Sequence, residues 1–416
     1  MIISRDTYLN KLIAHKHNHL IKIITGIRRC GKSYLLFKLF KTHLLDNGVS
    51  PSHIIEIELD DRINKHLRDP DNCLAYVRSL IKDSDMYYLL IDEVQYMSEF
   101  EDVLNSFLHI DNLDTYVTGS NSKFLSKDII TEFRGRGDEI HMYPLSVADF
   151  CAVHPELSWE ESWKLYWKFG GLPYVATLAD EEDKVSYLQR LFKEVYIKDI
   201  VERNHVKNDL ALERLLDMIS SCIGSLTNPL KLERAFKSMA NITLSSATIK
   251  TYLDYFEDAF LIEKADRYDI KGKKYISTPS KYYFTDVGLR NARLNFRQQE
   301  ETHIMENIIF NELLIRGYQV DVGIVEIYEK DEQGKYVRKQ IEVDFVANKG
   351  EKRCYIQSAF SLPTLEKVNQ EERPLRNISD SFKKIVIVKD NILPRVDESG
   401  IVTIGLKDFL LNNISI

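Results

Sequence analysis

The sequence predicts an α/β protein whose N-terminal part is built around a parallel β-sheet with helices on both faces. Short apolar runs alternate with helical patterns, and the runs fall at residues 20–25, 53–59, 87–91, 115–118 and 139–143. This alternation is typical of β-α-β units, because neighbouring parallel strands need a crossover helix to connect them. Two further observations support the α/β class. A glycine-rich segment follows the first run, and a second α/β pattern begins at residue 302.

The whole chain has the composition of an ordinary globular protein of about two or three domains. It has 416 residues, of which 44% are hydrophobic and 29% charged, and its net charge is −7. That charge excludes a protein that coats nucleic acid with its whole surface, although it is compatible with a local basic patch. The five cysteines are scattered without a C-x-x-C pair, and neither a signal-peptide pattern nor a membrane-spanning apolar stretch is present. We therefore expect a cytoplasmic protein without a membrane partner.

The glycine-rich segment at residues 26–33 matches the pattern G-x-x-x-x-G-K-[ST] of a P-loop. An apolar run precedes it and a helical run, residues 34–45, follows it. Glycines let consecutive backbone N–H groups turn toward phosphates, and the helix presents its positive end to them. Lys32 is expected to reach the β- and γ-phosphates, and the Ser33 hydroxyl to bind Mg²⁺. The residues expected to contact ATP are Gly26, Ile27, Arg28, Arg29, Cys30, Gly31, Lys32, Ser33 and Tyr34.

The third apolar run ends in two carboxylates, Asp92 and Glu93. A carboxylate at the end of such a strand can hold Mg²⁺ through water, and the next one can polarise an attacking water molecule. Strands that end in acidic residues are common, so this pair is informative only together with the P-loop. The two motifs jointly predict an enzyme that binds ATP with Mg²⁺, held by Ser33 and Asp92, and hydrolyses ATP with Lys32 and Glu93.

Two further segments are candidates for the catalytic site. The run at 115–118 is followed by Gly-Ser-Asn-Ser, where Asn121 can orient the attacking water, although an ordinary capped strand-to-helix turn has the same sequence. Arg134 and Arg136 precede the last run of the sheet. Either arginine can reach a γ-phosphate across a subunit boundary as an arginine finger, or can cap a helix or pair with a nearby carboxylate. We favour the finger, with Arg136 ahead of Arg134.

The middle of the chain predicts a DNA-binding unit. After a helical stretch broken by glycines at 170–171, an amphipathic helix at 248–262 is followed by two strand-like runs, 262–270 and 274–278, the outline of a winged helix. Residues 264–290 hold seven basic and three acidic side chains, a local balance of +4. A solvated hairpin or a protein contact would also fit this pattern. The candidates for contact with DNA are Lys250, Lys271, Lys273 and Lys274.

In combination, these motifs resemble those of a widespread prokaryotic family of AAA-type (AAA+) ATPases, whose C-terminal half was long labelled a domain of unknown function. The resemblance also covers Gly170-Gly-Leu-Pro173, Tyr196-Ile-Lys-Asp199, a helix at 246–256 and Ile341-Glu-Val-Asp-Phe345. It implies an AAA+ P-loop core (1–150), a helical lid or connector (151–230), a winged helix (231–295) and an α/β domain similar to restriction-endonuclease-type, PD-(D/E)xK nucleases (296–416).

Nucleases of that type need a helix glutamate, a strand-end aspartate and a [DE]-x-Lys triplet, in which carboxylates hold Mg²⁺ and the lysine helps to activate water. Here Glu306 and Asp344 match, with Glu342 two residues before Asp344. The triplet departs from the pattern, because Gln357 replaces the acid and Ala359 replaces the lysine. We therefore expect a degenerate nuclease site at Glu306, Asp344 and Gln357, without nuclease activity.

The sequence leaves three functional hypotheses. The first is an oligomeric, ring-forming ATPase that acts on DNA or is regulated by it. The second is a switch ATPase that acts on a protein partner, and the third is a nuclease gated by ATP.

Overall fold

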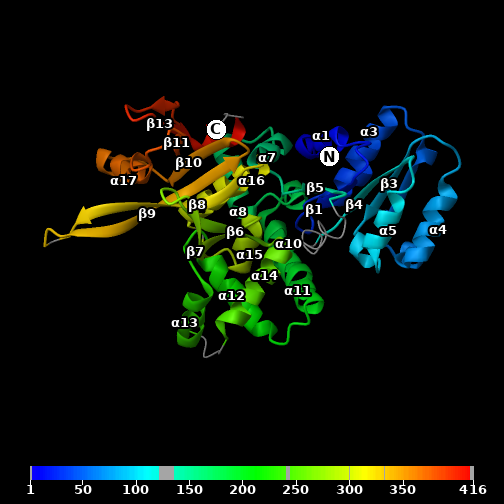
Figure 1. Ribbon diagram of the computed structural model, residues 1–416, viewed down its shortest axis with the longest axis horizontal. Coiled ribbons are helices and arrows are strands. Elements are labelled where there is room, and N and C mark those ends of the chain that lie inside the picture. Colours follow the sequence, from blue (N-terminus) through cyan, green and yellow to red (C-terminus); the bar gives the residue numbers. More distant parts are fainter. Residues whose placement is uncertain (1, 121–134, 240–243, 299, 332, 413–416) are drawn as a thin grey trace. The chain divides into compact units, whose positions relative to one another are not determined.

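The computed structural model describes residues 2–120, 135–239, 244–298, 300–331 and 333–412 (Figure 1). The chain forms two compact units. The first unit consists of Met1–Leu145 together with Leu172–Tyr174 and Asp258–Phe260, and the second unit of the remaining segments. Asn121 and Arg134 lie outside the described residues.

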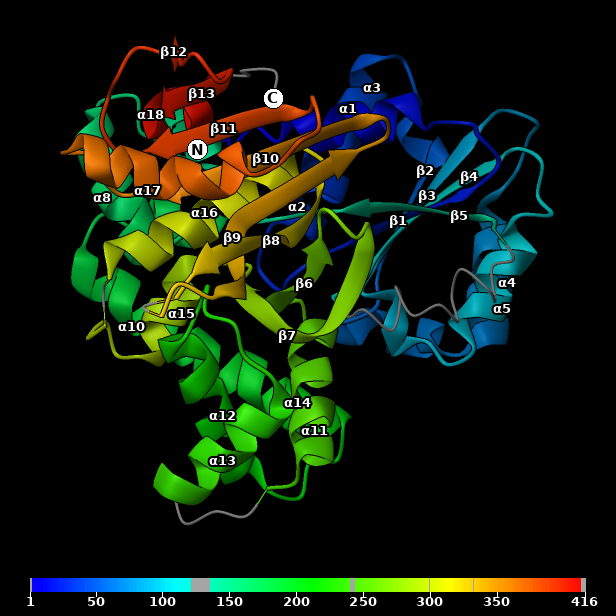
Figure 2. The same ribbon diagram turned by 60° about the vertical axis from the view of Figure 1, so that its left-hand side comes forward.

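The first unit is built on a sheet of five parallel strands in the order β2-β3-β4-β1-β5 (Figure 2). The strands are β1 Ile21–Thr25, β2 Ile54–Glu58, β3 Tyr87–Asp92, β4 Leu113–Thr118 and β5 Gly137–His141. Every residue of β1 and β3 is buried, as expected for central strands covered on both faces. The parallel sheet and the α/β class expected from the apolar runs are thus confirmed.

Helix α4, Pro70–Leu80, shows most clearly how the sequence starts a helix of the first unit. The helices are α1 Asp6–Ala14, α2 Lys32–Tyr34, α3 Lys41–Asp46, α4 Pro70–Leu80 and α5 Phe100–Phe107. A π-helical stretch, Leu35–Phe40, joins α2 to α3. Helix α4 begins after Asp69, whose side chain accepts a hydrogen bond from Asn72 N, and Pro70 occupies its first turn. Cys73 and Val77 of α4 pack with β3 in one buried core.

The second unit begins with a helical region. Its helices are α7 Val147–Val153, α8 Trp159–Phe169, α9 Pro173–Thr177, α10 Glu181–Leu191, α11 Lys198–Arg203, α12 Asp209–Ser221, α13 Pro229–Met239, α14 Ser246–Asp258 and α15 Val287–Arg293. Ser146 and Ser158 each start a helix through a capping box. Gly170 has a φ of 76°, and a Cβ there would lie 2.2 Å from Oδ1 of Asp286. The Asp286 carboxylate accepts a hydrogen bond from Gly171 N at 2.8 Å, so the glycine pair lets the chain close onto α15.

An eight-stranded mixed sheet forms the rest of the second unit, in the order β12-β13-β11-β10-β9-β8-β6-β7. The strands are β6 Ile262–Asp269, β7 Lys274–Phe284, β8 Gln319–Lys330, β9 Tyr336–Lys349, β10 Lys352–Ala359, β11 Lys383–Val388, β12 Arg395–Val396 and β13 Ile401–Gly405. The accompanying helices are α16 Glu301–Ile315, α17 Leu365–Arg376 and α18 Leu406–Leu411. Helix α16 contacts β7, β8 and β10, and α17 contacts β9, β10 and β11.

The β6–β7 hairpin follows α14, as the sequence predicts, but it is part of a larger sheet. Residues Arg267 to Asp269 of β6 pair in parallel with Val322 to Ile324 of β8. Ser280 of β7 also forms a bridge with Thr227, between α12 and α13. The pairing with β8 joins two segments that are about 50 residues apart, and no local sequence pattern indicates it.

Among the described residues, no helix combines the length and the apolar character that crossing a membrane requires.

Candidate functional site

The loop after β1 has the backbone of a phosphate-binding loop. Gly26 and Gly31 have φ values of 139° and 104°, in the range that only glycine adopts readily. A Cβ on Gly26 would lie 2.1 Å from the carbonyl oxygen of Met142, so no other residue fits there. The Lys32 side chain folds back over this loop, and its Nζ donates hydrogen bonds to the carbonyl oxygens of Gly26, at 2.9 Å, and Ile27, at 3.1 Å.

Asp92, the last residue of β3, lies beside the first turn of the helix that follows the loop. Its Oδ2 accepts a hydrogen bond from Ser33 Oγ at 2.7 Å, and its Oδ1 accepts one from Thr118 Oγ1. Burial raises the pKa of Asp92, and the hydrogen bonds from Thr118 and Ser33 oppose that rise. A serine hydroxyl and a carboxylate are hard oxygen donors of the kind that Mg²⁺ prefers, so this pair fits the metal expected from the sequence.

Glu93 is held in a strained position next to Asp92. Its backbone is left-handed, with a φ of 50°, which is uncommon for a residue other than glycine. Its N–H donates to Thr118 Oγ1 at 3.0 Å. Its Oε2 accepts hydrogen bonds from Ser120 Oγ, at 3.0 Å, and from Gln95 Nε2. These contacts fix the carboxylate on the same edge of the sheet as Ser33.

Strand β4 connects the P-loop with the two carboxylates of β3. Because β4 lies between β1 and β3 in the sheet, its end places Thr118 against Asp92 and Ser120 against Glu93. Within the Gly-Ser-Asn-Ser segment, the residue predicted from the sequence is Asn121, which lies outside the described residues. Neither Thr118 nor Gln95 is among the site residues predicted from the sequence. The available signal was their position, since Thr118 ends an apolar strand and Gln95 lies two residues after Glu93.

Arg136 lies at the opposite end of the sheet from the P-loop. It is exposed and directly precedes β5, which pairs in parallel with β1 so that Gly137 is opposite Ile21 and His141 is opposite Thr25. The four-residue step from Ile21 to Thr25 spans about 13 Å, and the P-loop begins after Thr25. The backbone of Arg136, which lies just before the residue opposite Ile21, is therefore farther than this from the P-loop of its own chain. An arginine in this place does not approach the phosphate loop of its own subunit.

His141, at the carboxyl end of β5, is a half-buried group that no sequence motif indicates. Its Nδ1 is 2.9 Å from Thr25 Oγ1, and its Nε2 is buried without a hydrogen-bond partner among the described residues. Burial, with smaller contributions from Lys32 and Lys11, lowers the pKa of His141 to about 3. The imidazole is therefore neutral at physiological pH.

In the second unit, four charged side chains gather on the α16 side of the sheet, and we call them the carboxylate cluster: Lys281, Glu306, Glu342 and Asp344. Lys281 Nζ is 2.9 Å from Glu306 Oε1, 2.7 Å from Glu342 Oε1 and 3.7 Å from Asp344 Oδ1. Burial alone would lower the pKa of Lys281, but Glu306, Asp344 and Glu342 more than offset it and leave the pKa raised. Burial and the neighbouring Glu306 raise the pKa of Asp344 to about 8.

The carboxylate cluster does not fit a divalent cation. The Lys281 ammonium already lies among the three carboxylates, in the place that a metal ion would need. Gln357 Oε1 is buried without a hydrogen-bond partner among the described residues. Tyr355 and Ala359 lie two residues before and two residues after Gln357 on β10, and both pack in one core with Leu375 of α17. Because side chains two residues apart on a strand share a face, strand alternation predicts that Gln357 faces the same way. We derive no metal-dependent step at this site.

The basic residues of the β6–β7 region differ in their availability. Lys281 and Arg290 are each only 2% exposed, and Arg290 Nε donates to the carbonyl oxygen of Ser220 at 2.9 Å. Neither side chain can contact a nucleic acid from this position. The exposed cations are Lys271, Lys273 and Lys274 at the hairpin turn, and Lys264 on β6, which pairs with Asp266 at 2.8 Å. Lys250 is exposed on α14.

Comparison with known proteins places the nucleotide site in a recognised type of domain. A family model described as an AAA domain matches residues 18–151, and one described as a domain of unknown function (DUF8612) matches residues 160–300. Among solved structures, the Orc1 protein of Aeropyrum pernix in complex with DNA has a TM-score of 0.28 and 12% identity, over 70% of this chain and 92% of that chain. Cdc6p of Pyrobaculum aerophilum has a TM-score of 0.31 and 10% identity, over 74% of this chain and 96% of that chain.

Two relatives match over nearly the full length. An uncharacterized protein of Methanocaldococcus jannaschii is 29% identical over 402 residues, which cover 94% of this chain and 83% of the relative. An uncharacterized protein of Haemophilus influenzae is 33% identical over 415 residues, which cover 99% of both chains. The chain therefore belongs to the family of the Haemophilus influenzae protein, and its first unit carries an AAA domain with the α/β fold of P-loop ATPases.

Proposed function

We propose that the first unit binds ATP with Mg²⁺ and hydrolyses it to ADP and phosphate. The observation that carries this proposal is the continuous set of hydrogen bonds from Ser33 through Asp92 and Thr118 to Glu93. It joins the helix after the P-loop to the ends of two neighbouring strands, so the groups for binding the metal and for activating water are held in fixed relative positions before substrate arrives.

Each residue has a separate role in this mechanism. Lys32 exchanges the carbonyl oxygens of Gly26 and Ile27 for phosphate oxygens when ATP enters the loop, and Ser33 and Asp92 hold Mg²⁺. The bound metal ion supplies positive charge that neutralises the phosphates. Glu93 orients and polarises the attacking water, while Gln95 and Ser120 prevent its carboxylate from rotating away.

Steady-state ATP hydrolysis tests the proposal, with the Lys32→Ala variant as the blank. Glu93→Gln is expected to bind ATP but to lose turnover by about 100-fold or more, because the base is removed while Asp92 stays in place. A fluorescent ATP analogue measures binding separately from turnover. Normal turnover in Glu93→Gln would remove Glu93 as the base, and normal turnover in Lys32→Ala would refute the P-loop assignment.

We further propose that the protein works as an oligomer, as a ring in which Arg136 of one subunit completes the ATP site of the next. The position of Arg136 supports this. It is exposed, and it lies at the edge of the sheet away from its own P-loop, so its guanidinium is available to a neighbouring subunit.

We propose DNA as the partner that stimulates ATP hydrolysis, through the exposed lysines of the β6–β7 turn and Lys250. Turnover is measured without DNA and with single-stranded, duplex and branched DNA. Stimulation by one form, lost in a Lys271→Ala/Lys273→Ala/Lys274→Ala variant, is the expected result.

A protein-directed switch is the second candidate function. The burial of Lys281 and Arg290 favours it, because it leaves a smaller basic surface than the sequence indicates. Slow turnover that no form of DNA changes would select the switch over the DNA-coupled ATPase.

A further inference from the structure

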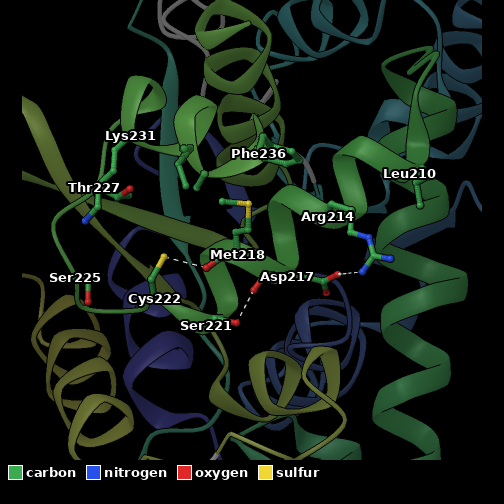
Figure 3. A pocket seen from close by; sticks show the side chains of 12 residues that line it. Leu210, Arg214, Asp217, Met218, Ser221, Cys222, Ser225, Thr227, Lys231 and Phe236 are labelled. Carbon is green, nitrogen blue, oxygen red and sulfur yellow. Dashed lines mark hydrogen bonds and ion pairs between the residues drawn. The ribbon is translucent and has the colours of Figure 1, made fainter. Parts of the chain in front are cut away.

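An open apolar pocket lies between α12 and α13 in the second unit (Figure 3). Its volume is about 770 Å³, within the range of about 300–1,000 Å³ typical of ligand pockets. Its apolar walls include Leu210 and Met218 from α12, Cys222 directly after that helix, and Leu232, Ala235 and Phe236 from α13. No part of it belongs to the nucleotide site or to the carboxylate cluster. We call it the helix groove.

The helix groove is formed by one stripe of side chains on each helix. The lining residues of α12, at positions 210, 214, 217, 218 and 221, follow the three-and-four spacing of a single helix face, and those of α13 do the same. The floor is part of the protein core, since Phe236 is fully buried. The rim is not, because Leu210 is 57% exposed. Apolar surface that stays open in a groove with a polar rim is typical of an interaction surface.

The rim of the helix groove carries positive charge. Arg214 and Lys231 line it from opposite helices, and both are exposed. The one acidic lining residue, Asp217, is bound by Arg293, with a distance of 2.6 Å from Nε to Oδ1. Arg214 is 3.8 Å from the same carboxylate and keeps 59% of its side chain exposed. The groove therefore carries an exposed cation on each side of an apolar floor, with Arg214 beside Asp217, within a chain of net charge −7.

We propose that the helix groove docks an amphipathic α-helix of a protein partner, with acidic residues flanking its apolar stripe. Two helices that each turn an apolar face into one groove can hold a third helix, whose anchors recur at positions i, i+3 or i+4, and i+7. The apolar anchors contact Leu210, Met218 and Phe236. The flanking carboxylates lie opposite Arg214 and Lys231, where they steer the approach and fix the orientation of the helix. This docking does not depend on ATP hydrolysis.

Fluorescence anisotropy of the full chain with labelled peptides tests the proposal. The probe is a synthetic helical peptide of about 15 residues with leucines at the anchor positions and glutamates beside them. Matched probes replace the glutamates with lysines, or the leucines with serines. Saturable binding of the acidic peptide, at least about tenfold tighter than either matched probe and weakened by salt, is the expected result.

Two variants assign that binding to the helix groove. Leu210→Glu places a carboxylate at the apolar rim and is expected to weaken the acidic peptide at least about tenfold. Leu393→Glu, a substitution of another exposed leucine outside the groove, leaves binding unchanged. Arg214→Glu is expected to weaken the acidic peptide and to strengthen the lysine peptide, whereas Arg234→Glu, on α13 but outside the lining, does neither. Equal thermal unfolding midpoints show that the variants are folded.

Three results would overturn the proposal. The first is the absence of saturable binding by the acidic peptide. The second is binding that Leu210→Glu does not change. The third is a combined result, in which laurate at low concentration displaces the peptide and Leu210→Glu abolishes the binding of laurate. This result would make the groove a site for a small amphipathic anion. Because ATP turnover is measured separately, failure here leaves the proposed ATPase untouched, and loss of turnover does not affect this test.

Discussion

At the scale of single residues, Thr118 determines how the two carboxylates of the nucleotide site are held. Its hydroxyl donates to Asp92 and accepts from the backbone N–H of Glu93. One side chain thus fixes both the residue proposed to hold Mg²⁺ and the residue proposed to activate water. Groups that orient metal ligands in this way commonly affect activity by about 10–100-fold.

Thr118→Val is therefore expected to lower kcat for ATP hydrolysis by about 10–100-fold, because valine keeps the shape of threonine but loses both hydrogen bonds. The KM for ATP should change less, since the P-loop is intact. Thr115→Val, in the middle of the same strand, is the matched control and should keep wild-type turnover. Equal kcat values for the two variants would show that Thr118 does not position the site.

His141 gives the protein a defined sensitivity to acid. Its pKa is about 3 in the folded state, against about 6.5 when unfolded, so between these values the unfolded state binds a proton that the folded state does not. The free energy of unfolding consequently falls as the pH drops below about 6.5, with a slope of up to about 1.4 kcal/mol per pH unit from this group. Above that pH the histidine is neutral in both states and contributes no slope.

His141→Asn is expected to reduce this dependence, because asparagine can still bond to Thr25 but does not titrate. Urea unfolding between about pH 7 and about pH 5 measures it. His109→Asn, at an exposed position after α5, serves as the control. Parallel stability profiles for wild type and His141→Asn would contradict the role given to His141.

At the scale of elements, the carboxylate cluster joins β7, β9 and α16 through one lysine. Lys281 neutralises part of the charge of three carboxylates, and it is 2% exposed. Tyr283 adds a hydrogen bond to Glu306 at 2.7 Å, and the backbone N–H of Ser358 adds one to Asp344 at 2.8 Å. Removing one partner of a buried ion pair typically costs about 3–5 kcal/mol.

Lys281→Met is expected to lower the free energy of unfolding by about 3–5 kcal/mol, because it leaves the carboxylates without their cation. Mn²⁺ should then recover part of the loss in the variant, by taking the place of the ammonium, and should leave the wild type unchanged. Lys264→Met, at an exposed pair with Asp266, is the control and should cost less than about 1 kcal/mol. Stabilisation of the wild type by Mn²⁺ would show that the cluster accepts a metal ion beside Lys281.

The elements that the sequence predicted are those whose signal is local. The P-loop, the acidic end of β3 and the amphipathic pattern of α14 each lie within a dozen or so consecutive residues, and the expected strands are present at those places. The position of Lys281 depends instead on how β7 lies next to α16 and β9. Its partners are 25 and 61 residues away in sequence, and a count of charges therefore assigned it to an exposed basic hairpin.

The candidate site was predictable to a similar extent. Ser33, Asp92 and Glu93 follow from motifs with fixed spacing, whereas Thr118 depends on the order of strands in the sheet. Helix groove residues have no motif at all, because an amphipathic stripe that faces a partner has the same spacing as one that faces the core.

At the scale of the whole molecule, the proposed oligomer makes a quantitative prediction. Arg136→Ala and Lys32→Ala are each expected to lose ATP turnover, by about 10³-fold or more for a true arginine finger. In a 1:1 mixture, about a quarter of the subunit interfaces combine an intact P-loop with an intact arginine, so turnover should recover toward a quarter of the wild-type value.

The double variant Lys32→Ala/Arg136→Ala is the control for this mixing experiment. Mixed with Lys32→Ala, it supplies no intact P-loop and should restore nothing. Lack of recovery in the mixture of single variants, with both proteins shown to assemble, would place each ATP site within one subunit.

The division of the chain into units also has a consequence for synthesis. The first unit includes Leu172–Tyr174 and Asp258–Phe260 besides its N-terminal segment, and Pro173 lies at the P-loop, with its Cγ 3.7 Å from where a Cβ on Gly31 would be. A ribosome that has released residue 145 must add about 115 more residues before the last of these segments exists, which takes roughly 6–23 s at about 5–20 residues per second. During that interval the nascent first unit is incomplete, and a chaperone that recognises exposed apolar surface can bind to it.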